Sequence, residues 1–347
     1  MCFRLCCLAL FVSSSLFGGK IVYLVPNDRS TVDECIWRYT PSCPNPNFYQ
    51  LLDKALGEHH ASLIVGDLSE FAKPDGQAQA SKIDTFIFCN MPLMAGPNWK
   101  ALIPRLPGKR LILIAFEPPT IMWDMYEPKT LALFSRVLTW NDKLVDKCKF
   151  FKFCYPYLLP RMPVIPSFSE KKFLTMVARY KRSSHANELY TERRRAIRYF
   201  DKHPKFGFEF YGVAWPGQKF PTWLGEIPGG RDGKLNILKH YRFCICYENM
   251  KDVKGYITEK IFDCFAAGVI PIYWGASNIE RYIPKNCYLL REDFSSMKSL
   301  VAYLQGMKEA EYNQYLANAR KFLSSSAAHQ FTQEKFIDIL IDQIFSE

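Results

Sequence analysis

The sequence contains no Gly/Ser-rich, Gln-rich or repeated tract, and 48% of its 347 residues are hydrophobic. A chain of this composition folds into a globular protein rather than staying disordered. It also lacks zinc-finger spacing and the aromatic-plus-basic signature of RNA-binding domains, so nucleic acid is not expected as a partner. The length allows two domains of ordinary size, which excludes a single small binding module.

No apolar run near the N-terminus is long enough for a membrane-spanning helix. The run over residues 5–17 is shorter than the roughly 20 residues that a spanning helix needs. Arg4 precedes this run, and small residues and Lys20 follow it, as in a secretory signal peptide. We therefore predict that residues 1–19 form a signal peptide, with a short membrane anchor as the second choice. An apolar first element of the fold is the remaining alternative.

The sequence has no Asn-x-Ser/Thr glycosylation site and shows no disulfide framework. Of its twelve cysteines, three lie in the N-terminal leader, which leaves an odd nine. Cys244 and Cys246 alternate in an apolar strand pattern and Cys264 lies in a helical one, which favours reduced core thiols. Only Cys35 and Cys43, in a Pro-rich loop, suggest a local bridge. The cysteines and the leader thus point to different compartments.

The formal charge of +11 and the pI near 9.0 favour anionic partners. These include nucleotides, phosphorylated lipids and an acidic membrane surface. We expect a membrane-associated protein or one of the secretory pathway, in the Golgi if eukaryotic. A bacterial protein would instead lie in the cytoplasm or at the inner-membrane face.

Short apolar runs alternate with helix-length segments along the whole chain. Because these runs are apolar on both faces, they predict parallel sheets covered by helices on both sides. The expected strands begin at Lys20, Ala61, Asp84, Arg110 and Arg136 in the first half, and at Lys171, Phe208, Tyr241, Val269 and Cys287 in the second. The fold class is therefore α/β.

A Pro-rich crossing over residues 156–168 is a poor helix or central strand and is the best candidate linker. We predict an N-terminal domain over residues 20–160 and a C-terminal domain over residues 161–347. Two such domains would face a central cleft, where α/β proteins usually bind their ligands. An amphipathic segment over residues 332–345 predicts a final helix that packs on the fold.

The stretch "CYENMKDVKGYITEKIFDCFAAGVIPIYWG", residues 246–275, carries the strongest chemical signal. A buried strand ends at Glu248, and a helix is expected from Thr258, as N-cap, to Gly268. Glu259 and Lys260 occupy its first turn. Free N–H groups, the helix dipole and the lysine favour a diphosphate there, whereas the glutamate can accept hydrogen bonds from sugar hydroxyls. Taken alone, such residues are more often merely solvated.

The whole string "FCICYEN…GYITEKIFDCFAAGVIPIYWG" resembles the donor-binding signature of glycosyltransferase family 10, the α1,3/α1,4-fucosyltransferases, over residues 241–294. The resemblance implies a GT-B-like architecture of two Rossmann-like domains. The first would bind the acceptor and the second GDP-fucose. It also implies inverting transfer of L-fucose from GDP-β-L-fucose to a hydroxyl of an N-acetylglucosamine-type glycan.

Carried over residue by residue, the resemblance assigns the donor site. Lys260 would hold the diphosphate, and Glu259 the ribose or fucose hydroxyls. Tyr256 would line the nucleotide pocket, with Asn249 and the neighbouring Glu248 facing it. The family's phosphate clamp also includes an arginine on the preceding helix. Here "NELYTERRRAIRYF" offers three, and the pattern favours Arg193 over Arg194 and Arg195, although such a triplet is often a solvated basic face.

The base that takes the acceptor proton should come from the first domain. Glu117 follows an apolar strand in "LILIAFEPPTIMW", in a setting similar to that of the family's proposed base. The family usually has Glu-Ser-Pro at this point, whereas here Pro118 follows the glutamate directly. Without the resemblance, Glu117 would be an ordinary loop residue.

The sequence contains no Asp-x-Asp triplet, the usual carrier of a divalent ion on a nucleotide sugar. Basic side chains and the helix terminus would then stabilise the leaving diphosphate, so we expect no metal and no other cofactor. Two alternatives stay open: the same fold acting on another GDP-sugar, and a catalytically silent protein that binds glycans or nucleotides.

Overall fold

The computed structural model describes residues 19–26, 46–73, 75–91, 99–106, 109–157, 164–216 and 219–346. Residues 1–18 of the predicted leader, Cys35 and Cys43, and the middle of the Pro-rich crossing lie outside these ranges. Within them the chain divides into two compact units. The first comprises Met1–Phe153 and Gln333–Glu347, and the second comprises Cys154–Thr332.

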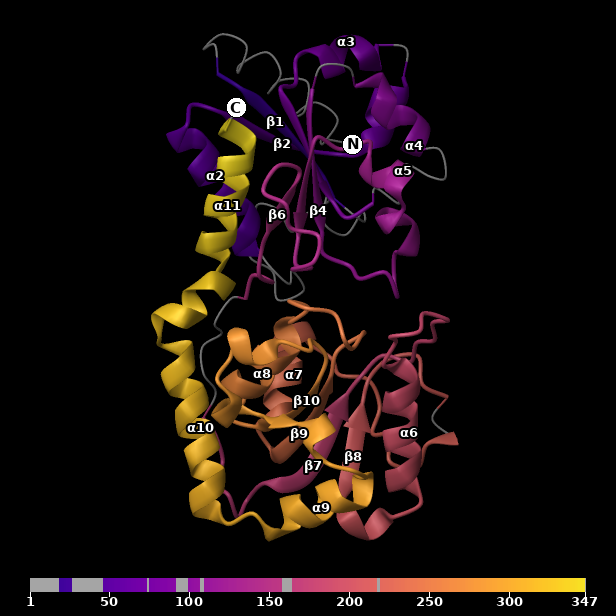
Figure 1. Ribbon diagram of the computed structural model, residues 1–347, viewed down its shortest axis with the longest axis vertical. Helices are drawn as coiled ribbons and strands as arrows, with labels where there is room; N and C mark the ends of the chain where they lie inside the picture. The colour runs from indigo at the N-terminus through magenta and orange to yellow at the C-terminus, as the bar shows by residue number, and fades with distance from the viewer. Residues whose placement is uncertain are drawn as a thin grey trace. The chain divides into compact units, whose positions relative to one another are not determined.

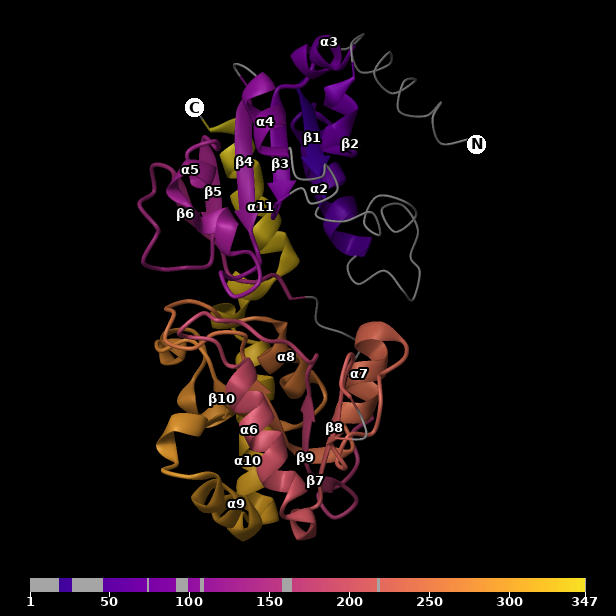
Figure 2. The same cartoon turned by 90° about the vertical axis from the view of Figure 1, so that its right-hand side faces the viewer.

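The first unit contains a six-stranded parallel sheet in the order β2-β1-β3-β4-β5-β6. Its inner strands are almost fully buried, because their residues are apolar on both faces. Figure 2 shows β1, β3 and β4 side by side. The strands are β1 (Ile21–Val25), β2 (Ser62–Val65), β3 (Thr85–Cys89), β4 (Arg110–Ala115), β5 (Arg136–Thr139) and β6 (Phe150–Lys152).

Helices and short 3₁₀ turns connect the strands of the first unit. They are α2 (Pro46–Glu58), η2 (Leu68–Ala72), α3 (Gly76–Ser81), α4 (Trp99–Leu102), η4 (Ile103–Arg105), η5 (Trp123–Tyr126) and α5 (Pro128–Leu131).

The last helix, α11 (Gln333–Phe345), completes the first unit rather than the second. It packs beside α2, as Figure 1 shows. The ring of Phe336 lies 5.8 Å from Phe48, 5.6 Å from Phe116 and 5.3 Å from Phe153. Arg110 donates hydrogen bonds to two backbone carbonyls near the end of α11. The amphipathic pattern predicted this packing helix, whereas the predicted domain over residues 161–347 placed it in the other unit.

The second unit contains a five-stranded parallel sheet in the order β11-β10-β9-β7-β8. The backbone N–H of Tyr157 donates to the carbonyl of Phe331, 2.6 Å away, so this unit begins and ends at neighbouring points. Its strands are β7 (Lys172–Val177), β8 (Phe208–Tyr211), β9 (Tyr241–Tyr247), β10 (Ile270–Trp274) and β11 (Leu289–Leu290). The expected α/β class with parallel sheets is therefore confirmed in both units.

The helices of the second unit pack on both faces of its sheet. One hydrophobic cluster contains α7, α8, Cys244 and Cys246, whereas the other contains α6, Ile245 and Tyr247. Alternate residues of β9 thus face opposite sides, as a doubly covered strand requires. The elements are α6 (Tyr190–Asp201), η6 (Pro204–Phe206), α7 (Gly230–Leu238), α8 (Glu259–Ala266), η8 (Ile279–Arg281), η9 (Lys285–Cys287), η10 (Arg291–Asp293), α9 (Met297–Gly306), α10 (Glu309–Leu323) and η11 (Ser326–Phe331).

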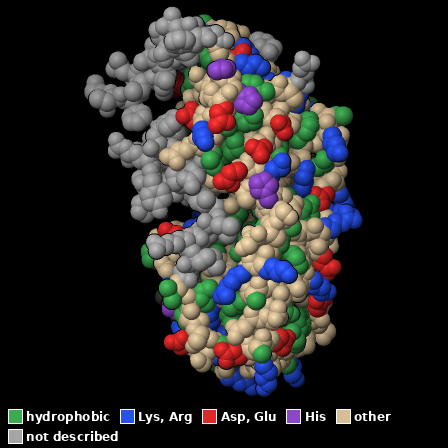
Figure 3. All heavy atoms as spheres, turned by 90° about the vertical axis from the view of Figure 1, so that its left-hand side faces the viewer, with side chains coloured by type: hydrophobic (Ala, Val, Ile, Leu, Met, Phe, Trp, Pro, Cys, Tyr) green, Lys and Arg blue, Asp and Glu red, His purple; other side chains and the backbone are tan. Residues whose placement is uncertain are grey.

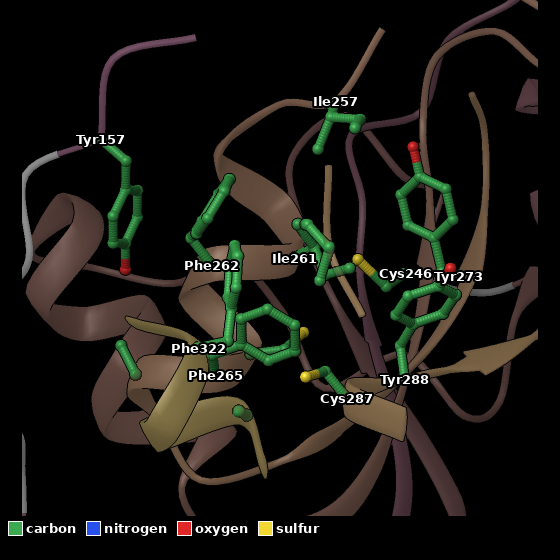
Figure 4. Packing of buried hydrophobic residues seen from close by; sticks show 14 of the residues in the cluster. Tyr157, Cys246, Ile257, Ile261, Phe262, Phe265, Tyr273, Cys287, Tyr288 and Phe322 are labelled. Atoms are coloured by element: carbon green, nitrogen blue, oxygen red, sulfur yellow. The ribbon is translucent and has the colours of Figure 1, made fainter. Parts of the chain in front are cut away.

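Aromatic packing fixes α8 against its neighbours. The ring of Phe262 lies 4.9 Å from Tyr157 and 4.7 Å from Phe331, and Phe265 contacts Phe322 (Figure 4). After α8 the chain turns at Gly268, whose φ of +63° favours glycine. The helix predicted from Thr258 to Gly268 is confirmed.

The seven cysteines in the described ranges are all free, and five of them are buried. Cys244, Cys246 and Cys264 are therefore reduced core thiols, as the sequence predicted. No helix in the described ranges has both the length and the hydrophobicity needed to cross a bilayer. On the face shown in Figure 3, acidic and basic side chains are interspersed, so the net charge does not form a single patch there.

Candidate active site

The carboxylate of Glu248 is the centre of the polar cluster at the end of β9. Its side chain has 0% exposure. Oε1 accepts the Thr258 backbone N–H at 2.8 Å, and Oε2 accepts the Thr258 hydroxyl at 2.8 Å. Lys260 Nζ lies 2.9 Å from Oε2. A buried charge is tolerated only with such partners, so Glu248 ties the end of β9 to the start of α8.

Thr258 occupies the N-cap position of α8 with extended backbone, as predicted, but its side chain caps no backbone N–H. The hydroxyl instead bonds Glu248 and accepts from Lys260 Nζ at 2.8 Å. The buried carboxylate is the stronger partner for the hydroxyl, since hydrogen bonds to charged groups exceed neutral ones in strength.

Lys260 is held as a cation at the first turn of α8. Burial acts to lower its pKa, but Glu248 and then Glu259 outweigh burial and raise the pKa above its usual value, against the repulsion of Arg193. Its side chain is 22% exposed and its Nζ lies 3.8 Å from Glu259 Oε1. The ammonium is therefore fixed in place while part of it still meets solvent.

Glu259 is the exposed carboxylate of this cluster, with 51% of its side chain accessible. Burial acts to raise its pKa, but the cations of Lys260 and Lys234 outweigh burial and bring the pKa to about 2. An ionised carboxylate only accepts hydrogen bonds. Glu259 can therefore receive hydroxyl donors from solvent or from a ligand at neutral pH.

Arg193 reaches the same point from α6, on the other face of the sheet. It is 6% exposed, and its Nη2 donates to the Tyr247 carbonyl at 2.6 Å and to Asn249 Oδ1 at 3.1 Å. Burial lowers the pKa of its guanidinium. The structure thus brings Arg193, Asn249, Glu248 and Lys260 together at the carboxyl end of β9.

The other two arginines of the triplet point elsewhere. Arg194 donates to the Lys181 carbonyl and to the Thr191 hydroxyl. Arg195 is exposed and pairs with Glu192 on its own helix. Arg193 is therefore the member placed at the cluster, although its phosphate contact stays a prediction.

Tyr256 lies deeper than its predicted role requires. It is 1% exposed, its carbonyl accepts from the Tyr273 hydroxyl at 3.2 Å, and its ring lies 6.1 Å from Tyr155. In this structure the ring belongs to the packed interior beneath the cluster rather than to an open pocket wall. Its contact with a nucleotide remains a prediction.

Sequence reasoning missed Lys234 and Asp263. Asp263, on α8, is 1% exposed, and its Oδ2 accepts from Lys234 Nζ of α7 at 2.7 Å. Lys234 lines a small cavity of about 20 Å³ together with Arg193 and Lys260. The available signal was "GGRDGK", residues 229–234, a glycine-rich turn that places a lysine in the first turns of a helix.

Glu117 lies in the first unit, two residues beyond the end of β4, as the strand pattern predicted. Its backbone N–H donates to Asn90 Oδ1 at 2.8 Å, and its carbonyl accepts from the Tyr126 hydroxyl at 2.7 Å. Burial, reinforced by the Glu117 charge, raises the pKa of that phenol. The backbone of Glu117 is thus held from two sides, and its half-buried side chain remains a candidate base.

In the described part of the chain, no three His, Cys, Asp or Glu side chains are grouped so that they could hold a metal ion. Independence from metal remains a prediction.

Residues 169–340 match the family model described as glycosyltransferase family 10 (fucosyltransferase), C-terminal. Through this region the chain belongs to glycosyltransferase family 10. It is 28% identical to the α-(1,3)-fucosyltransferase 4 of Bos taurus over 216 residues, which are 59% of the chain and 48% of that relative. It is 29% identical to the Homo sapiens protein of that name over 211 residues, or 58% and 36% of the two chains. The chain thus spans less than half of these family 10 relatives.

Solved structures show which fold this family 10 chain adopts. A crystal structure of an α1,3-fucosyltransferase with GDP covers 97% of the chain and 96% of its own, with a TM-score of 0.59 and 13% identity. Another, with GDP-fucose, covers 95% and 91%, with a TM-score of 0.55 and 15% identity. At this identity the likeness shows the fold alone, which is the GT-B fold of two α/β units. The predicted family and fold are confirmed.

Proposed function

We propose that the protein transfers L-fucose from GDP-β-L-fucose to a glycan hydroxyl, with inversion at the anomeric carbon and an N-acetylglucosamine-type acceptor. Family membership supports a glycosyltransferase. The names of the mammalian relatives and the nucleotides bound in similar structures support fucose and GDP. An Arabidopsis thaliana relative, an α-(1,4)-fucosyltransferase, is 37% identical over 82 residues, or 23% of the chain and 20% of that protein.

The observation that carries the proposal is the fixed cation at the start of α8. Lys260 is held by Glu248 and Thr258, and it opposes Arg193 across the end of β9. Negative charge develops on the diphosphate as the sugar leaves, and preorganised cations stabilise that charge without reorganising. The positive end of the helix dipole adds to them. No divalent ion is needed for this role.

The remaining residues take complementary parts in the proposal. Glu259, ionised and half exposed, accepts the ribose or fucose hydroxyls. Arg193 holds the diphosphate, and Asn249 orients its guanidinium. Tyr256 supports the nucleotide pocket. Glu117 takes the proton from the acceptor hydroxyl as that oxygen attacks the anomeric carbon from the side opposite GDP.

The test is product analysis after incubation with GDP-fucose or GDP-mannose and a panel of acceptors. The panel includes N-acetylglucosamine-containing glycans, galactosides and peptides. We expect mass spectrometry to show one added fucose on the glycan and NMR to show an α linkage. Transfer from GDP-mannose alone would identify GDP-mannose as the donor in place of GDP-fucose. A β linkage in the product would contradict inversion. Intact GDP binding without any transfer would indicate the catalytically silent binding protein.

Peptides belong in the panel because of one further relative. The GDP-fucose protein O-fucosyltransferase 3 of Xenopus laevis is 29% identical over 144 residues, or 37% of the chain and 30% of that protein. Fucosylation of peptides but not of glycans would move the acceptor to that class.

We also propose that the protein acts in the secretory pathway or at an anionic membrane surface, because of its predicted leader and its charge of +11. Flotation with vesicles of anionic and of neutral lipids tests the surface. Binding to neither would remove the membrane from the proposal.

A further inference from the structure

Asp263 is a buried carboxylate that receives two cations from one neighbouring helix. It lies on α8 with 1% exposure, and α7 supplies Arg231 Nε at 3.1 Å and Lys234 Nζ at 2.7 Å. One carboxylate balances one cation, so this group carries an excess positive charge in a mostly buried place. The Arg231 guanidinium also lies over the Tyr157 ring, 4.2 Å from the ring centroid. Arg231 is therefore occupied by Asp263 and Tyr157.

Lys234 is turned toward the cluster at the end of β9. Asp263 and Glu259 together outweigh the effect of burial and raise the pKa of its ammonium. In return, the cation of Lys234 helps to keep Glu259 ionised. Its side chain is 21% exposed, close to the 22% of Lys260. Lys234 is therefore a charged, partly accessible group that acts electrostatically on the first turn of α8.

Three cations from three helices line one cavity. Arg193 comes from α6 on one face of the sheet, whereas Lys234 and Lys260 come from α7 and α8 on the other. Each is fixed by its own acceptor: Lys234 by Asp263, Lys260 by Glu248, and Arg193 by two uncharged oxygens. Like charges are not brought together in this way by packing alone, since their repulsion costs free energy.

The cavity has a volume of about 20 Å³, enough for one water molecule. The largest part of an anionic ligand that could enter it is a single phosphate oxygen. An oxygen there would meet donors from both faces of the sheet and would relieve the repulsion among the three cations.

We propose that Lys234 is a third cation of the diphosphate site, held in position by Asp263 and directed at a phosphate oxygen between Arg193 and Lys260. The inference rests on the proposed function, because it takes the ligand to be GDP or a GDP-sugar. It adds a residue from α7 to a site that the sequence placed on α6 and α8 alone.

The test compares the affinities of Lys234→Met and wild-type protein for GDP, GMP and guanosine by calorimetry. We expect the substitution to weaken GDP binding by about tenfold to a hundredfold, the usual worth of a charged hydrogen bond. GMP should lose less, and guanosine should bind unchanged. Lys239→Met, the same change at the C-cap of α7, is the matched control and should leave all three affinities as in wild type.

Two further variants keep the test decisive. Lys234→Arg preserves the charge and should retain most of the GDP affinity. Lys234→Gln supplies a neutral side chain that can still donate to Asp263 if the methionine variant fails to fold. Unchanged GDP affinity in the neutral variants, or an equal loss for guanosine, would overturn the inference and make Lys234 a purely structural partner of Asp263. If the wild-type protein bound no GDP, both the proposed function and the inference about Lys234 would fail.

Discussion

Lys260 Nζ lies 2.9 Å from Oε2 of Glu248, a carboxylate without exposed surface. The two residues are twelve positions apart and join the end of β9 to the first turn of α8. Because the partner is buried, the ammonium cannot move away without leaving an uncompensated charge. The geometry of this helix start is thus set before any ligand arrives.

Lys260→Ala should lower kcat and weaken donor binding together. The substitution removes a positive charge that binds the donor and stabilises the negative charge that grows on the diphosphate as GDP leaves. We expect a loss of about 10²–10³ in kcat/KM for GDP-fucose. The melting temperature should also fall, because the buried Glu248 loses its cationic partner and keeps only its bonds from Thr258, so rates must be measured well below that temperature. Lys254→Ala, an exposed lysine of the preceding loop, is the control. A kcat/KM near that of wild type would remove Lys260 from the donor site.

Glu259 should contribute to stability in a defined acid window. Its pKa is lowered from 4.5 to about 2, so the folded state binds its proton less readily than the unfolded state. The contribution is complete above pH 4.5 and is lost as the pH falls toward 2. Glu259→Gln should therefore flatten the dependence of the unfolding free energy on pH in this window, measured by urea denaturation. Glu226→Gln is the control, and an unchanged slope for Glu259→Gln would contradict the ionised state of Glu259.

Chelation should leave most transferase activity intact. The chain has no Asp-x-Asp triplet, and the proposal gives the leaving diphosphate fixed cations in place of a metal ion. Activity is to be measured after dialysis against EDTA, with and without added Mn²⁺ or Mg²⁺. Complete loss of activity after EDTA treatment, restored by added Mn²⁺, would contradict the metal-free mechanism.

Glu117→Gln should separate transfer from donor binding. The glutamine keeps the size of the side chain but cannot accept the acceptor proton, so transfer should fall by about 10²–10⁴. Calorimetry should give a near-normal dissociation constant for GDP, because the proposed GDP-binding residues belong to the other unit. Glu127→Gln, a half-buried glutamate of the first unit that pairs with Lys100, is the control. Unimpaired transfer would make Glu117 a bystander, and joint loss of GDP affinity and melting temperature would make it structural.

The sequence predicted the elements whose signals are local. Runs that are apolar on both faces identified the strands from β1 to β5 and from β7 to β11, and the N-cap and glycine signals bounded α8. The strand β6 (Phe150–Lys152), at one edge of the first sheet, was not anticipated. It is three residues long and only partly buried, so it shows no clear hydrophobic period.

The parts that the sequence did not reveal depend on contacts between distant residues. Nothing near Thr258 shows that its hydroxyl would turn to Glu248, and nothing near Lys234 shows that Asp263 would hold it. The unit that α11 joins was also hidden, since an amphipathic pattern says that a helix packs but not where. Arg193 was favoured over its neighbours because helical spacing alone separates the buried arginine from the partly buried Arg194 and the exposed Arg195.

The return of α11 to the first unit has a consequence for biosynthesis. The aromatic side chain of Phe336 packs on three phenylalanines that emerge from the ribosome before any of the second unit. At about 5–20 residues per second, synthesis of residues 154–332 takes on the order of ten seconds or more. During that time the first sheet lacks one of its covering helices. By the time α11 is synthesised, all strands of the second unit have been made. The nascent chain therefore completes the first unit only after the second, and Phe48, Phe116 and Phe153 lack their contact with α11 until then.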